Sequence, residues 1–379
     1  MSAGSRPLRI AYFVHDLNDP AVARRVGMLS RGGGQVRLLG FHRGAAAPER
    51  VAGVEALSLG RTRDGRMVSR AASVAVALAR GLGAPAAAAA DVVIARNLEM
   101  LAVASGAARH RTLVYECLDI HRLLLSAGTA GRVLRAVERR LLGRVRLLLV
   151  SSPAFLSGYL QPKQGYGGPT MLLENKALAL DATDPGRPPA ATAARPDGPP
   201  WRIGWFGMIR CARSLRMLIQ LSEQLEGGLE VLIAGRPAYD QFDDFDGQVA
   251  RARFVRFTGG YAPADLPALY GGVHFTWAID YFEEGLNSAW LLPNRLYEGG
   301  LYGSTPIALA SVETGRWLAR RGAGVLIEDP LAELAPLLER LRPADYAALR
   351  RASLAIPLDD LRATETDCTA LVAKLEALA

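Results

Sequence analysis

The sequence predicts an α/β protein with two Rossmann-like domains whose parallel sheets face each other across a cleft. Short apolar runs alternate with helical patterns along most of the chain, which is typical of parallel sheets covered on both faces. A Pro-rich stretch interrupts this alternation, and 379 residues exceed what one hydrophobic core usually supports. We expect an N-terminal domain over residues 1–180, a linker over 181–200, a C-terminal domain over 201–358, and a helix over 359–379 that returns to the N-terminal domain.

The first strand and helix are predicted from the start of the chain. Leu8–Val14 is a continuous apolar run that ends in a polar loop. Asp19 suits the N-cap of the next helix, and Pro20 suits its first turn. The Gly32-Gly33-Gly34 run follows that helix, which favours a helix end over a phosphate-binding loop. Further strands are expected at Gln35–Phe41, Asp91–Ala95, Thr112–Glu116 and Leu147–Ser151.

The same rhythm restarts after the Pro-rich linker. Strands are expected at Arg202–Phe206, Glu230–Ala234, Val255–Thr258, Val273–Trp277, Pro306–Ala310 and Gly324–Ile327, and a last helix at about Asp360–Ala379. Open parallel sheets bind ligands at the carboxyl ends of their strands, so the cleft between the two domains is the expected site.

Composition indicates a cytoplasmic protein. The three cysteines show no C-x-x-C spacing, which fits a reducing compartment and argues against a structural zinc site. No secretory signal is visible at the start of the chain. The Ala-rich stretch Ala71–Ala95 contains Arg80 and Asp91, so we expect a helix, a loop and a strand there rather than a membrane span.

The charge is divided unevenly along the chain. Residues 1–180 hold 25 Lys and Arg against 11 Asp and Glu, a net charge of +14, whereas residues 181–379 hold 20 against 26, a net charge of −6. A basic half suggests an anionic partner, either nucleic acid or the anionic inner face of a membrane. Within that half, Arg132–Arg146 places six arginines among Leu and Val at helical spacing.

Two interpretations of this basic segment remain open. It is either a surface helix with its apolar side on the core or a helix that lies on an anionic leaflet. Nucleic acid is disfavoured, because no aromatic interleaving or nucleic-acid motif accompanies the charge.

The start of the C-terminal domain predicts a diphosphate site. Its first strand leads to a glycine turn at Gly207, and Arg210 and Arg213 then open a helix. Helix N-terminal amides and forked guanidinium donors together bind phosphate groups. A later helix, within residues 292–306, has Glu298, and a carboxylate there can accept two hydroxyl bonds from a ribose.

These two segments resemble the GT-B glycosyltransferases of the family-4 type, in particular those of bacterial exopolysaccharide synthesis. Four more segments agree with that family in order along the chain: Tyr115–His121, Leu149–Ser152, Leu173–Lys176 and Val231–Gly235. The resemblance implies transfer of a glycosyl group, usually with retention, from a nucleotide-diphosphate sugar (UDP- or GDP-linked) to a hydroxyl group. It also implies a lipid-linked or oligosaccharide acceptor, and no other cofactor.

The resemblance assigns donor-site roles to particular residues. Arg210 and Arg213 would bind the diphosphate beside Gly207, and Glu298 would bind the ribose with Asn294 and Arg295 near it. Preorganised cations stabilise a departing diphosphate, so no metal is required.

The family commonly has a second glutamate eight residues before the first, where this chain has Trp290. Glu284 or Asp280 is therefore expected near the sugar, with Asn287 and Ser288 near phosphate. The missing glutamate motivates an alternative, namely a GT-B module that binds nucleotide or sugar without turnover.

The acceptor side is expected at strand ends of the N-terminal domain. His15 and Asp16 follow the first strand, and Glu116, Asp119 and His121 lie at another strand end. His15 and Asp16 are candidates for acceptor contact or for a base, and equally for a simple turn and cap. Asp119 or His121 is a candidate for acceptor contact, and Asp119 is also a catalytic candidate.

Several other patterns favour structural roles. Asp244-Phe-Asp246 matches a D-x-D metal motif, but its acidic surroundings favour a solvated loop. His274 lies in an apolar strand, and Cys117 and Cys211 are expected to pack in the core. A dinucleotide oxidoreductase would need G-x-G-x-x-G after Val14, and the sequence has His-Asp-Leu-Asn-Asp-Pro instead.

Overall fold

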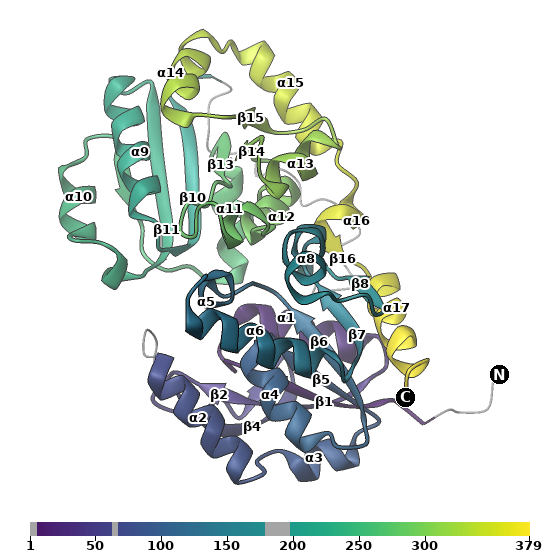
Figure 1. Cartoon of the computed structure of the whole chain (residues 1–379). Helices are drawn as coiled ribbons and strands as arrows, with labels where there is room; N and C mark the ends of the chain where they lie inside the picture. Colours follow the sequence, from purple (N-terminus) through teal and green to yellow (C-terminus); the bar gives the residue numbers. More distant parts are fainter. Residues whose placement is uncertain (1–5, 63–66, 179–197) are drawn as a thin grey trace. The chain divides into compact units, whose positions relative to one another are not determined.

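The computed structural model describes residues 6–62, 67–178 and 198–379, and the chain divides into two compact units (Figure 1). Unit 1 comprises the chain up to residue 178 together with residues 363–379, and unit 2 comprises residues 179–362. Each unit is an α/β domain with a mostly parallel sheet, which confirms the predicted fold class. The predicted linker lies outside the described residues except for positions 198–200.

Unit 1 contains an eight-stranded sheet in the order β3-β4-β2-β1-β5-β6-β7-β8. All neighbouring strands are parallel except β3 and β4. The strand order reverses between β1 and β5. The strands are β1 (Arg9–Val14), β2 (Gln35–His42), β3 (Arg50–Val51), β4 (Val54–Arg61), β5 (Val92–Arg96), β6 (Thr112–Cys117), β7 (Val145–Val150) and β8 (Thr170–Leu172).

Helices cover this sheet, and the final helix of the chain is one of them. Leu371, Val372 and Leu375 of α17 share a hydrophobic cluster with Val26 and Leu29 of α1. The helix starts at Glu365, after two shorter elements. The helices of unit 1 are α1 (Pro20–Arg31), α2 (Met67–Ala79), α3 (Ala84–Ala89), α4 (Asn97–Ala107), α5 (Arg122–Leu125), α6 (Thr129–Leu142), α7 (Pro153–Phe155), the π-helical turn η1 (Leu156–Leu160), α8 (Gln161–Gln164) and α17 (Glu365–Glu376).

The Ala-rich stretch forms α2 and then β5, as predicted, but the expected loop between them contains a second short helix, α3. Among the helices that the structure describes, none combines the length and the apolar character needed to span a membrane. The basic segment is shorter as a helix than its sequence pattern predicts. Helix α6 ends at Leu142, because Gly143 caps it, and Arg146 lies on strand β7.

Unit 2 contains a six-stranded parallel sheet in the order β12-β11-β10-β13-β14-β15, which reverses between β10 and β13. Its strands are β10 (Trp201–Ile209), β11 (Leu229–Pro237), β12 (Val255–Phe257), β13 (Phe275–Trp277), β14 (Thr305–Leu309) and β15 (Val325–Ile327). Its helices are α9 (Ala212–Gln224), α10 (Phe245–Arg251), α11 (Leu266–Gly271), α12 (Asn294–Leu301), α13 (Glu313–Ala319), α14 (Pro330–Arg340), α15 (Pro343–Leu354) and α16 (Leu358–Leu361), with 3₁₀ turns η2 (Tyr239–Gln241), η3 (Pro263–Asp265) and η4 (Asn287–Ala289). Short strands β9 (Ala177–Leu178) and β16 (Arg362–Ala363) pair with each other.

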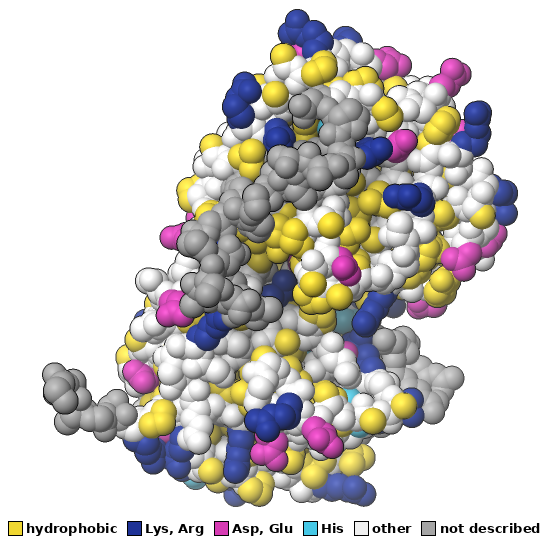
Figure 2. All heavy atoms as spheres, turned by 180° about the vertical axis from the view of Figure 1, so that it is seen from behind, with side chains coloured by type: hydrophobic (Ala, Val, Ile, Leu, Met, Phe, Trp, Pro, Cys, Tyr) yellow, Lys and Arg dark blue, Asp and Glu magenta, His cyan; other side chains and the backbone are white. Residues whose placement is uncertain are grey.

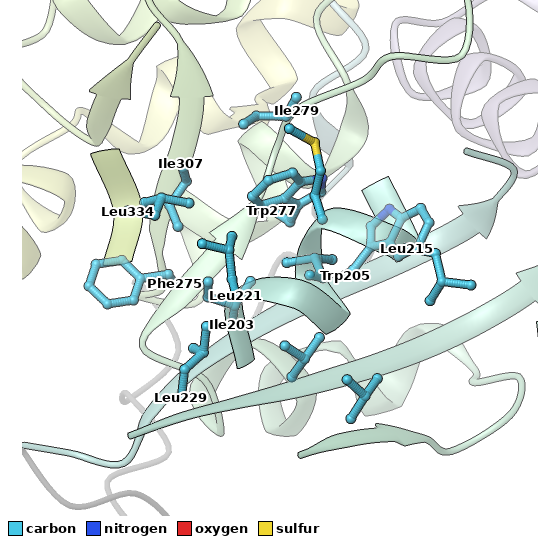
Figure 3. Packing of buried hydrophobic residues seen from close by; sticks show 14 of the residues in the cluster. Ile203, Trp205, Leu215, Leu221, Leu229, Phe275, Trp277, Ile279, Ile307 and Leu334 are labelled. Carbon is cyan, nitrogen blue, oxygen red and sulfur yellow. The ribbon is translucent and has the colours of Figure 1, made fainter. Parts of the chain in front are cut away.

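The core of unit 2 fixes the two strands at which the sheet order reverses. Figure 3 shows Trp205 of β10 and Trp277 of β13 among aliphatic side chains of the same cluster, which also includes Leu215 of α9. Both tryptophans are buried. The indole of Trp277 donates to the hydroxyl of Ser214 at 3.2 Å, which ties β13 to the first turn of α9. The loops that follow β10 and β13 therefore start from rigid positions.

Candidate active site

The candidate donor site lies where the sheet order of unit 2 reverses. Arg210 directly follows β10, and Asp280 follows β13 by three residues. Ligands of open parallel sheets bind at such a reversal, outside the carboxyl ends of the strands. The guanidinium Nη2 of Arg210 lies 3.4 Å from Oδ2 of Asp280. The structure therefore brings together two residues that the sequence analysis assigned to the donor.

Glycines let the backbone pack closely at this edge. Gly207 has φ of +104° and Gly235 has φ of +137°, a region that favours glycine. A Cβ atom on Gly235 would lie 1.9 Å from the carbonyl oxygen of Gly207. Gly207 lies inside β10 rather than in a turn after it, because the strand continues to Ile209. That is a correction to the predicted glycine turn.

Aromatic rings position the two arginines. The guanidinium carbon of Arg213, in the first turn of α9, lies 4.1 Å from the ring centre of Tyr281. The guanidinium carbon of Arg210 lies 4.5 Å from the ring centre of Phe282. Both contacts have cation–π geometry. Helix α9 is capped by Cys211, whose sulfur accepts from the amide of Ser214 at 3.4 Å, so this cysteine does more than pack.

The loop after β13 is held by hydrogen bonds that centre on Asp280. Oδ1 of Asp280 accepts from the amide of Phe282 at 2.7 Å and from the hydroxyl of Ser288 at 3.2 Å. That hydroxyl also accepts from the amide of Glu283 at 2.9 Å. Asn287 and Ser288 are buried, whereas Glu284 is exposed and accepts from Arg213. This hydrogen bond to Glu284 raises the pKa of Arg213.

Helix α12 supplies the other predicted donor residues. Oε2 of Glu298, a buried carboxylate, accepts from the hydroxyl of Tyr270 at 2.8 Å. Burial and Glu298 raise the pKa of Tyr270 well above its ordinary value, so the hydroxyl remains a donor. Nη1 of Arg295 is covered and makes no hydrogen bond to any described residue. Burial lowers the pKa of Arg295, and Asp280 opposes that shift. Asn294, the first residue of α12, is exposed.

The carboxylate of Glu116 differs from the sequence-based expectation. It lies at the end of β6 and is only 1% exposed. Its oxygens accept from Nε of Arg25 at 2.6 Å, Nε of Arg96 at 3.1 Å and the hydroxyl of Tyr12 at 2.5 Å. Burial favours a raised pKa, but Arg96 and Arg25 outweigh burial and lower the pKa of Glu116 to about 2. In this structure Glu116 therefore lies inside a buried ionic cluster, not on a surface that an acceptor can reach.

His15 and Asp16 follow β1 and are largely covered. Nε2 of His15 lies 3.8 Å from Oδ2 of Asp19, the residue that caps α1 through Oδ1, as the sequence predicts. Burial lowers the pKa of His15, with Asp19 opposing the shift, so the imidazole is neutral at pH 7. Asp16 forms an ion pair with Arg43 at 3.2 Å.

Asp119 and His121 are exposed in the loop after β6. Nδ1 of His121 accepts from the amide of Leu123 at 3.3 Å and caps α5. The structure thus places His15 and Asp119 after strands β1 and β6, which are separated in the sheet by β5 alone.

The sequence analysis missed the arginines around Glu116. Arg25 stands at a buried position of α1, between Val22 and Val26 on the apolar face. Arg96 ends the buried strand β5 and is fully buried. An arginine at an apolar position of a helix, together with one at a buried strand end, is a signal for a buried carboxylate partner.

The other singled-out residues have structural partners. Oδ1 of Asp244 accepts from the amide of Gly247 at 2.9 Å and caps α10, and Oδ2 pairs with Arg251 at 3.2 Å. Within the described ranges, no three His, Cys, Asp or Glu side chains are grouped to hold a metal ion. His274 is buried, and its Nδ1 accepts from the amide of Arg202 at 2.9 Å. Cys117 is buried and unbridged.

Comparison with known proteins shows which family the chain belongs to. No protein-family model matches the chain. The chain is 49% identical over 384 residues to the succinoglycan biosynthesis protein ExoL of Rhizobium meliloti (strain 1021), a match that covers 98% of this chain and 94% of that protein.

Solved structures share the fold, and one of them is a glycosyltransferase. HepE of Anabaena, in complex with UDP and glucose, matches with a TM-score of 0.69 at 17% identity, over 98% of this chain and 100% of that one. WaaG, a glycosyltransferase involved in lipopolysaccharide biosynthesis, matches with a TM-score of 0.63 at 14% identity, over 96% of this chain and 99% of that one. The chain therefore belongs to the family of the succinoglycan biosynthesis protein ExoL and has the GT-B fold of glycosyltransferases, as the resemblance of its motifs predicted.

Proposed function

We propose that the protein is a glycosyltransferase that moves a sugar from a nucleotide-diphosphate donor to a hydroxyl acceptor during exopolysaccharide assembly. The observation that supports this best is the pair of arginines at the strand-order reversal of unit 2, each stacked on an aromatic ring. The relationship to ExoL, a succinoglycan biosynthesis protein, supports the same kind of pathway.

In this proposal the arginines stabilise the leaving group. As the bond between the anomeric carbon and the diphosphate breaks, negative charge grows on the phosphate oxygens, and Arg210 and Arg213 lie ready to neutralise it. Their stacking on Phe282 and Tyr281 holds both guanidinium groups at this edge of the sheet. These cations support a reaction that proceeds without a metal ion. Retention at the anomeric carbon is part of the proposal, by resemblance to the family.

The other donor residues have complementary roles. Glu298 binds the ribose hydroxyls, with Asn294 and Arg295 beside it on α12. Asp280 and Glu284 face the transferred sugar, and Asn287 and Ser288 lie toward phosphate. Uracil is the base we favour over guanine, because HepE was solved with UDP and with UDP-glucose.

The acceptor is proposed to bind at the carboxyl edge of the sheet in unit 1. His15, Asp16, Asp119 and His121 follow strands β1 and β6 there. A neutral His15 is able to accept a hydrogen bond or a proton from an acceptor hydroxyl. A lipid-linked or oligosaccharide acceptor fits a step in exopolysaccharide assembly.

Helix α6 supports a location on the anionic inner face of the cytoplasmic membrane. Val133 and Val137 are 56% and 43% exposed, although a surface helix normally buries its apolar side. Arg132, Arg139 and Arg140 lie on the same outward side and are exposed, whereas Glu138 is buried. Apolar residues flanked by arginine are typical of helices that bind an anionic leaflet. We call residues 132, 133, 137, 139 and 140 the outer face of α6.

On the face of the molecule drawn in Figure 2, the positive charge is dispersed. Figure 2 shows Lys and Arg side chains spread over the drawn face and interspersed with Asp and Glu. A nucleic-acid surface needs a continuous basic patch, so this arrangement does not favour one on that face.

A thermal-shift panel tests the proposed function. Wild-type protein and Arg213→Ala are heated with UDP, GDP, CMP, ADP and NAD, and then with the sugar-linked forms of any nucleotide that binds. A ligand at 100 times its Kd adds about 2.7 kcal/mol to the free energy of unfolding. We expect one nucleoside diphosphate to stabilise wild type and to lose that effect in Arg213→Ala. No shift with any nucleotide contradicts the proposal, and binding without transfer to any lipid-linked acceptor favours a module without turnover.

A further inference from the structure

Arg213 has a carboxylate partner within the protein. Its guanidinium donates to Glu284, which lies in the loop after β13. The side chains of Arg213 and Glu284 are 46% and 55% exposed, so this ion pair is open to solvent. The ring centre of Tyr281 lies 4.1 Å from the same guanidinium carbon. The Glu284 carboxylate therefore occupies hydrogen-bonding capacity that a diphosphate would need.

The second arginine has a partner of a different kind. Asp280, the partner of Arg210, has a side chain that is only 8% exposed. Its Oδ1 is fixed by the Phe282 amide and the Ser288 hydroxyl. Moving Asp280 would break those bonds, whereas Glu284 has Arg213 as its hydrogen-bond partner among the residues that the structure describes. Asp280 is thus a fixed partner and Glu284 an exchangeable one.

We infer that Glu284 makes the donor site discriminate between a nucleotide-sugar and the spent nucleoside diphosphate. This inference rests on the proposed function. When the diphosphate group of either ligand binds Arg213, Glu284 loses its cation and lies beside a like charge. The nucleotide-sugar and the free diphosphate therefore both lose binding free energy. A sugar offers hydroxyl donors to the displaced carboxylate, whereas the free diphosphate offers none. Glu284 therefore weakens binding of the diphosphate more than binding of the nucleotide-sugar.

The consequence concerns product release. A ligand that breaks an interaction without replacing it binds more weakly by the free energy of that interaction. The spent diphosphate is therefore released more readily, and it competes less with fresh donor. Glu284 is a specificity-determining residue for sugar-loaded donor in this account.

The test compares two ligands on three proteins. Dissociation constants of UDP and UDP-glucose are measured by calorimetry for wild type, Glu284→Gln and Glu230→Gln; GDP and GDP-glucose replace them if the panel selects guanine. Glu230 is the matched control, because it also pairs with an arginine, Arg202, at 2.8 Å and is 46% exposed in the same unit. We expect Glu284→Gln to tighten UDP binding by about two- to fivefold, the range of an exposed ion pair.

The nucleotide-sugar is expected to respond differently. UDP-glucose binding to Glu284→Gln stays unchanged or weakens. The dissociation constant of UDP divided by that of UDP-glucose therefore falls below its wild-type value. In Glu230→Gln this ratio stays at the wild-type value. An unchanged ratio in Glu284→Gln, with nucleotide binding that still depends on Arg213, overturns this inference and leaves the proposed function standing. Absence of nucleotide binding to wild type overturns both.

Discussion

Glu116 lies between two buried arginines, and its charge balances theirs. In Glu116→Gln, the guanidinium groups of Arg25 and Arg96 lose their carboxylate in a site that water does not reach. Breaking a buried ion pair by removing one partner costs about 3–5 kcal/mol. We expect the free energy of unfolding of unit 1 to fall by about that amount, measured by urea denaturation at pH 7.

The pH dependence of this prediction follows from the lowered pKa. The Glu116 carboxyl has an ordinary pKa of 4.5, and in the folded chain its pKa is about 2. Its stabilising contribution is therefore complete above pH 4.5 and is lost as the pH falls through the folded pKa. The difference in the free energy of unfolding between wild type and Glu116→Gln should narrow as the pH falls from 4.5 to about 2. A surface control, Asp345→Asn, which breaks the exposed pair with Arg342, should leave stability unchanged at pH 7. Equal effects in the two variants contradict the prediction.

The positions of Arg210 and Arg213 in the fold were easier to predict than the contacts of the buried cluster, for a physical reason. Arg210 and Arg213 follow a strand and open a helix, so local sequence fixes their place at the sheet edge. The partners of Glu116 come from α1, β1 and β5, up to 104 residues away along the chain. Tertiary packing decides such pairing. The periodicity of the sequence shows only that Arg25 and Arg96 occupy positions that are usually apolar.

Among the elements, α1 and α17 meet at a glycine. Gly32 caps α1, and a Cβ atom there would lie 2.3 Å from the carbonyl oxygen of Cys368 in α17. Backbone cannot yield as a flexible side chain does, so Gly32→Ala should displace α17. We expect a loss of about 1–3 kcal/mol in the free energy of unfolding, the usual cost of overpacking.

Gly167→Ala in the same unit is the control, because a Cβ atom there meets nothing within 4 Å. Hydrogen exchange of peptides from α17 should quicken in Gly32→Ala only. Unchanged exchange in both variants shows that α17 is not held at this contact.

Helix α6 makes a prediction about membranes. If its outer face binds an anionic leaflet, Arg132→Gln with Arg140→Gln should weaken binding to vesicles that contain phosphatidylserine, by about 1 kcal/mol per arginine. The measurement is co-sedimentation at low and high salt, and Arg251→Gln with Arg342→Gln in unit 2 is the charge-matched control. Binding that does not depend on vesicle charge, or that falls equally in both double variants, contradicts a role for α6.

Elements were predictable where periodicity was strong. Strands β1, β6 and β11 end within three residues of their predicted limits, because continuous apolar runs between polar loops define buried strands. Strand β4 was not predicted, since the exposed positions along Val54–Arg61 leave no clear apolar run. The end of helix α6 was predicted four residues too late, because arginine and apolar residues continue past the cap at Gly143.

At the scale of the whole molecule, the sequence analysis anticipated two α/β domains and the return of the last helix to unit 1. The reason is that alternation of strands and helices is repeated on either side of a Pro-rich segment, whatever the details of each loop. Assignment of one ligand to each unit is a stronger claim. Arg210, Arg213, Asp280, Glu284 and Glu298, the residues proposed for the donor, all belong to unit 2.

Hydrogen exchange with bound nucleotide therefore tests the division of labour between the units. Saturating UDP should slow exchange of amides in residues 203–215 and 280–298, where the backbone and side chains of the donor site lie. At 100 times the Kd, the added stability of about 2.7 kcal/mol corresponds to a slowing of up to about a hundredfold for amides that exchange through unfolding of unit 2. Peptides that contain His15 and Asp119 in unit 1 should exchange as they do without ligand, and Arg213→Ala should lose the protection in unit 2. Protection confined to unit 1 would place the nucleotide on the wrong domain and, with it, reverse the assignment of donor and acceptor.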